Sequence, residues 1–147
     1  MKPTRLNTLV KNMLLGICAI MIVLSFNSCT KKVDFLLSSV SPAARGYVKV
    51  KRDNNKNYVI KINLSDLAEV DRLQPSKQTY VVWLVTDDGT TKNIGRLNSS
   101  MGLFSKKLTA SFKTVSSLNP TKIFITAEND ASTQYPGEQV IITTDRF

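Results

Sequence analysis

The sequence predicts an all-β domain, an antiparallel β-sandwich of about seven strands that is immunoglobulin-like in size. Three observations favour this fold. After residue 45, apolar residues alternate with polar ones along much of the chain, which is the period of a strand with one buried face. Turn residues such as Asn, Asp, Gly and Pro separate the short apolar runs. No long helical pattern lies between them, so a sandwich is expected, with a barrel as the alternative.

The first two strands are expected at 48–51 and 59–64. The segment 53–57 between them, Asp-Asn-Asn-Lys-Asn, is typical of a hairpin because Asn and Asp tolerate left-handed backbone angles. Apolar residues at three-residue spacing then predict one or two helical turns within 65–73.

The run 79–85 is almost entirely β-branched or aromatic, which predicts a central strand buried on both faces. Trp83 is therefore expected in the core, and a ligand-stacking role is the alternative. Asp87-Asp88-Gly89 is a strong turn signal. The remaining strands are expected at 91–97, 103–112, 122–128 and 138–145.

The first 28 residues have the organisation of a signal peptide. Lys2, Arg5 and Lys11 precede an uncharged apolar run at 13–26. As a helix this run would span about 21 Å, less than the roughly 30 Å of a bilayer's hydrocarbon core. A cleaved signal is therefore favoured over a transmembrane anchor.

Cys29 ends the segment Ser25-Phe26-Asn27-Ser28-Cys29, which resembles a relaxed lipobox. Phe26 replaces the usual leucine and Asn27 is atypical, whereas Ser28 fits the small-residue position. The resemblance implies a bacterial lipoprotein precursor in which residues 1–28 are removed and Cys29 becomes the acylated, palmitate-bearing first residue. The alternative is an ordinary secretory signal cut near Ser28.

Residues 29–44 are expected to form a lipidated tether ahead of a domain at 45–147. Val33-Asp34-Phe35-Leu36-Leu37 is an apolar patch in it that could instead form a short strand docked on the domain. Because no Asp follows Cys29, the resemblance to lipoproteins implies the outer membrane, and we expect the protein to face the periplasm.

The chain carries a formal net charge of +9, and three of its 20 cationic residues leave with the signal peptide. The remaining cations are scattered along the sequence, which is typical of a solvated surface; weak contact with anionic headgroups is the alternative. Nucleic acid is not an expected partner of an exported protein.

The composition excludes several kinds of catalysis. The chain has no histidine, and its two cysteines are Cys18 in the signal peptide and the lipid site Cys29. Ser-His-Asp and Cys-His arrangements and His/Cys zinc sites therefore cannot form, and no cofactor or metal is expected. Carboxylates remain for a glycosidase-like hydrolase. The candidates, each at an expected turn or loop, are Asp66, Glu69, Asp71, Asp87, Asp88, Glu128 and Asp130.

Three short motifs occur together in the second half of the chain. In order they are Tyr80-Val81-Val82-Trp83-Leu84-Val85, Asp88-Gly89 and Ile94-Gly95-Arg96-Leu97. They resemble the extracytoplasmic C-terminal domain of anti-sigma-K factors. Ala127-Glu128, Pro136-Gly137 and the last apolar strand continue the pattern, so the resemblance covers residues 78–145.

The resemblance implies a sensory or interaction domain whose ligand is unknown. Sigma-factor binding is not implied, because that family's cytoplasmic helical domain has no counterpart in these residues. The family's Gly-Gly-Ser after the glutamate is also replaced, by residues 129–132. We expect a lipid-anchored envelope protein whose sandwich binds a partner or ligand without catalysis. The expected contact surfaces are the loops Asn98–Gly102 and Asn129–Gly137 and any unpaired edge strand.

Overall fold

The computed structural model describes residues 8–23, 30–101 and 108–147. Helix α1 (Thr8–Val23) covers much of the apolar segment expected as a signal peptide. No helix in the described parts of the chain is long and apolar enough to cross a membrane. Cys29 lies outside the described residues.

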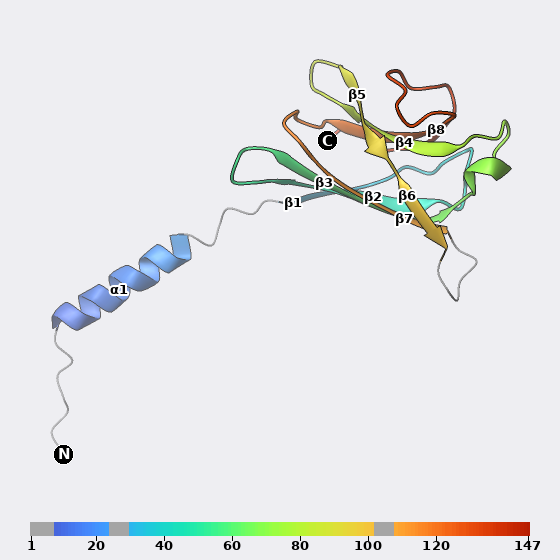
Figure 1. Ribbon diagram of the computed structural model, residues 1–147. Helices are drawn as coiled ribbons and strands as arrows, with labels where there is room; N and C mark the ends of the chain where they lie inside the picture. The colour runs from blue at the N-terminus through green and yellow to red at the C-terminus, as the bar shows by residue number, and fades with distance from the viewer. Residues whose placement is uncertain (1–7, 24–29, 102–107) are drawn as a thin grey trace.

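The described residues after 29 form two antiparallel sheets that lie one above the other (Figure 1). The five-stranded sheet has the order β1 (Thr30–Asp34), β2 (Arg45–Arg52), β3 (Tyr58–Leu67), β7 (Leu108–Ser116), β6 (Asn98–Met101). The four-stranded sheet has the order β5 (Thr91–Arg96), β4 (Thr79–Val85), β8 (Lys122–Glu128), β9 (Val140–Thr143). The predicted sandwich is confirmed, with nine strands in the described residues where about seven were expected.

The core lies between the two sheets because each strand turns its apolar alternate residues inward. On β3 the buried residues are Ile60, Ile62 and Leu64, and the facing sheet contributes residues such as Leu84 and Ile125. All residues of the core cluster and those packed against it lie between residues 35 and 147. Within the described residues, the core therefore includes no side chain from α1.

The domain begins earlier than the expected tether allows. Thr30–Asp34 pairs with β2 along its whole length, and Val33 lies opposite the buried Val48. Phe35 then forms an isolated antiparallel β-bridge to Thr144, which directly follows β9 at the edge of the four-stranded sheet. Of the two alternatives for the apolar patch, the structure therefore favours the docked strand, because Val33 and Phe35 gain burial there.

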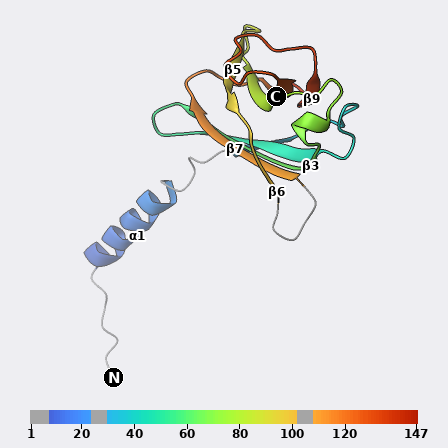
Figure 2. The ribbon, with the colours of Figure 1, turned by 45° about the vertical axis from the view of Figure 1, so that its right-hand side comes forward.

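The expected loop Asn98–Gly102 is also different in the structure. Asn98–Met101 is strand β6, which pairs with β7, and Gly102 lies outside the described residues. The chain crosses from β5 in one sheet to β6 in the other through the buried Leu97 (Figure 2). The strand expected at 103–112 is described from Leu108, and it extends to Ser116.

Two turns follow from local chemistry. In the β2–β3 hairpin, Asp53 Oδ1 accepts hydrogen bonds from the backbone amides of Asn55 and Asn57, as an Asx turn requires. The helical turns expected within 65–73 reduce to one 3₁₀ turn, Val70–Arg72. They are shorter than expected because β3 continues to Leu67 past a register shift.

Candidate functional site

Trp83 is fully buried, as predicted, but on the outer side of the four-stranded sheet. Its strand neighbours Val82 and Leu84 belong to the core between the sheets, so Trp83 points the opposite way. Its ring stacks on Phe124 of β8, with the ring centroids 6.2 Å apart. Something other than the second sheet must therefore keep water from this indole.

The cover is the segment 129–137, the expected contact loop, which we call the strap. The strap lies over β4 and β8 (Figures 1 and 2). Asn93 of β5, which pairs with Trp83, donates hydrogen bonds from its side-chain amide to the carbonyls of Ala131 (2.9 Å) and Thr133 (2.8 Å). On the β8 side, the Gly137 amide donates to Glu128 Oε1 at 2.7 Å. The strap is thus fastened on both sides of Trp83.

Glu128 has a structural role in this arrangement. Its side chain is buried and accepts a hydrogen bond from the Thr126 hydroxyl at 2.5 Å. Thr126 Oγ1 in turn accepts a hydrogen bond from the indole N–H of Trp83 at 2.8 Å. A Cβ on Gly137 would lie 2.8 Å from a Glu128 carboxylate oxygen, so a larger residue there would require the Glu128 side chain to shift. The Glu128 side chain therefore holds the strap and the Thr126 hydroxyl in place.

A groove of about 820 Å³ lies between the strap and β5. The lining combines apolar surface with hydroxyl and amide groups, and its one large aromatic residue is Tyr135, whose exposed fraction is 80%. An exposed tyrosine beside polar donors and acceptors is typical of protein recognition surfaces, since it offers apolar area and a hydroxyl at once. The lining residues are Thr90, Thr91, Lys92, Asn93, Gly95, Ala131, Ser132, Thr133, Gln134 and Tyr135.

The turn that shapes one wall of the groove is held by a carboxylate. Asp130 Oδ1 accepts hydrogen bonds from the Ser132 amide and the Ser132 hydroxyl, both at 2.8 Å. The hydrogen bond from the Ser132 backbone amide, followed by the one from the Ser132 hydroxyl, holds the pKa of Asp130 below its usual range. The groove wall therefore has a defined shape that does not depend on a ligand.

The other candidate carboxylates mostly hold local structure too. The Thr86 hydroxyl and the Thr90 amide bond to Asp88 and keep the pKa of that carboxyl below its usual range. Glu69 forms an ion pair with Arg72 at 2.6 Å. Within the described residues, no group of three or more His, Cys, Asp or Glu side chains could hold a metal ion.

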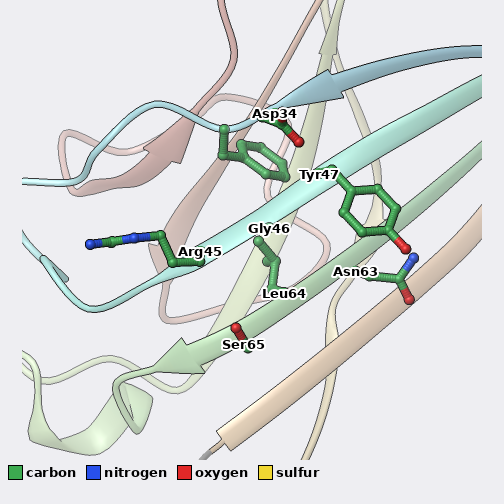
Figure 3. A pocket seen from close by; sticks show the side chains of 8 residues that line it. Asp34, Arg45, Gly46, Tyr47, Asn63, Leu64 and Ser65 are labelled. Carbon is green, nitrogen blue, oxygen red and sulfur yellow. The ribbon is translucent and has the colours of Figure 1, made fainter.

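A second hollow, of about 460 Å³, lies at the end of β1 (Figure 3). The Tyr47 ring and the Asn63 amide lie next to each other there, whereas Arg45 extends away from them (Figure 3). Gly46 is required at this point, because a Cβ would clash with the Asn63 carbonyl oxygen and lie 2.5 Å from Leu64 Cδ2.

Comparisons with family models, with curated proteins and with solved structures find no match. The site residues are therefore assigned from the geometry of the structure. Of the expected contact surfaces, the strap lies against a groove, whereas Asn98–Met101 is paired as a strand. Sequence reasoning missed Asn93, whose one signal is a polar amide in the middle of a strand.

Proposed function

We propose that the protein is a lipid-anchored envelope protein whose β-sandwich binds a partner protein or ligand without catalysis, in the groove between the strap and β5. The observation that carries the binding site is the exposed Tyr135 beside a hollow whose wall is already shaped by Asn93 and Asp130. A preformed hollow lowers the entropic cost of binding. The signal-peptide pattern and Cys29 support the anchorage.

The resemblance to the anti-sigma-K factor domain supports a sensory role for the same groove. The resemblance covers residues 78–145, a range that includes β5 and the strap, whose residues line the groove. The ligand's identity does not follow from the resemblance.

A carboxylate-dependent hydrolase is the alternative. Such an enzyme needs two carboxylates facing one cleft, one of them free to move a proton. Glu128 is instead hydrogen-bonded to the strap, and Asp88 and Asp130 are bonded within their own turns. These contacts favour binding over hydrolysis.

A photoreactive phenylalanine analogue at position 135, in the full-length protein in intact cells, is expected to crosslink a reproducible envelope partner. The same analogue at Asn55, in the exposed β2–β3 hairpin, is the matched control and is expected to give no such product. Tyr135→Ala, made in a protein that carries the analogue at Gln134, should lower the yield about tenfold, as loss of a central aromatic contact does. Single substitutions are used because replacing the whole strap would uncover Trp83.

Two results would contradict this proposal. Equal crosslinking from positions 135 and 55 would show that the groove is not the contact surface. Turnover of an envelope glycan by the purified domain, stopped by an Asp→Asn change, would establish the hydrolase instead.

A further inference from the structure

Four lysines form a continuous row across the outer face of the five-stranded sheet. The strand register places Lys32 opposite Lys49, Lys49 opposite Lys61, and Lys61 opposite Lys113. All four are exposed, and the residues beside them on β2 and β3 are buried, so the lysines lie on the side away from the core. With about 4.8 Å between strands, this lysine row spans about 14 Å.

The row is expected to lower the stability of the fold. Like charges directly opposite each other on neighbouring strands repel. Lysines on edge strands are common because they prevent edge-to-edge aggregation. That reason does not apply to Lys49, Lys61 and Lys113, because β2, β3 and β7 are interior strands of the sheet.

Little in the described residues neutralises the row. Lys32 pairs with Asp34 at 3.3 Å. The ammonium groups of Lys32 and Lys49 lie 4.7 and 5.2 Å from the centre of the Tyr47 ring. Among the ion pairs of the described residues, none involves Lys49, Lys61 or Lys113.

Two hollows extend this basic face on either side of Lys61. One, of about 440 Å³, is lined by three lysines and one acidic residue, and it reaches Thr30 at the start of β1. These four residues are Lys49, Lys51, Lys61 and Asp53. The other, of about 630 Å³, is lined by Lys61, Lys113 and Arg96. Cations around two shallow hollows on one face complement a surface that presents many separate anionic groups.

We infer that the lysine row docks the domain on the anionic headgroups of a phospholipid bilayer. The inference rests on the proposed anchorage, because Thr30 directly follows Cys29 and β1 carries the first lysine of the row. A lipid on Cys29 holds the lysine row next to headgroups, which favours a membrane over a soluble polyanion. The strap covers the opposite sheet, so a docked domain turns its groove away from the membrane (Figure 1).

The test uses residues 30–147 without lipid, since this segment contains every residue of the core cluster in the described parts of the chain. The domain is expected to co-sediment with vesicles made from equal parts of phosphatidylglycerol and phosphatidylcholine, but not with phosphatidylcholine vesicles. Raising the salt from about 0.05 M to about 0.5 M should release it, because screening shortens the reach of these charges. The salt dependence can be measured on the unaltered domain.

The variant Lys49→Gln, Lys61→Gln, Lys113→Gln is expected to bind anionic vesicles on the order of 100-fold more weakly, at about fivefold per lysine. Its thermal unfolding should be unchanged or shifted upward, because repulsion along the row is removed. The matched control, Lys77→Gln, Lys122→Gln, Arg146→Gln, removes the same charge from outside the row and should keep most of the binding.

The orientation has its own test, because residues 30–147 contain no cysteine. An environment-sensitive label on Ser111→Cys, on the same face as the row, should shift to shorter wavelength with anionic vesicles. The same label on Gln134→Cys, in the strap, should not shift.

Several results would overturn the docking. These are equal binding to both vesicles, equal loss in both triple variants, a shift from the strap label, or binding to heparin without binding to vesicles. Heparin binding alone would make a soluble polyanion the occupant. Absence of lipid on Cys29 would overturn the anchorage, and the vesicle result would still decide whether the lysine row binds headgroups.

Discussion

Replacing Trp83 with alanine is expected to destabilise the domain by about 3–5 kcal/mol, the range for large aromatic residues removed from a buried site. The indole is fully buried, stacks on Phe124 and donates its N–H to Thr126. Alanine would leave a cavity under the strap and remove that donor. Denaturant unfolding followed by circular dichroism measures the effect, since the variant has lost the chain's single tryptophan.

Trp83→Phe is the matched control for the Trp83 prediction. Phenylalanine keeps most of the buried apolar area and the stacking on Phe124 but not the N–H, so a loss of about 1–2 kcal/mol is expected. Trp83 emission at the wavelength of a solvated indole in the unaltered protein would contradict the burial under the strap.

Replacing Gly46 with alanine is expected to destabilise the domain by about 3 kcal/mol, at the upper end of the usual overpacking range. The added Cβ would clash with the backbone carbonyl of Asn63, which cannot move without disturbing the β2–β3 register. The free energy of unfolding from a denaturant titration checks this value.

Gly89→Ala separates crowding from backbone strain. Gly89 has a φ of +82°, but no heavy atom lies within 4 Å of the position its Cβ would take. Left-handed backbone alone accounts for a loss of about 1 kcal/mol there. Equal losses for the two alanine variants would show that the close approach at Gly46 is not what requires glycine.

The strands that the sequence predicts correctly are those with a clear apolar pattern, because that pattern alone indicates which side chains are buried. β2 and β3 alternate around a hairpin with Asp53 at its start, and β4 is nearly all β-branched or aromatic. β1 and β6 are less apolar, and the strands beside them supply their hydrogen-bond partners. Such edge strands form because a neighbouring strand pairs with them, and this pairing cannot be read from the local residue pattern.

The same limit explains the candidate sites. Burial of Trp83 follows from its residue type and strand, but its place outside the core depends on the strap, which Asn93 and Glu128 hold. The four lysines are far apart in the sequence, where they look like scattered surface charges. The strand register alone brings them into one row.

Together these features describe a domain with two different outer faces. One carries the strap and a groove with the exposed Tyr135, and the other carries the lysine row. A lipid close to the start of β1 would fix how these two faces lie relative to a membrane. Cys29 is the residue on which that anchorage depends.

Labelling cells with radioactive palmitate tests the anchorage most directly. The unaltered protein is expected to take up the label at Cys29 and to fractionate with the outer membrane, and Cys29→Ser is expected to abolish the label. An unaltered protein that takes up no label and is recovered free in the periplasm would contradict it.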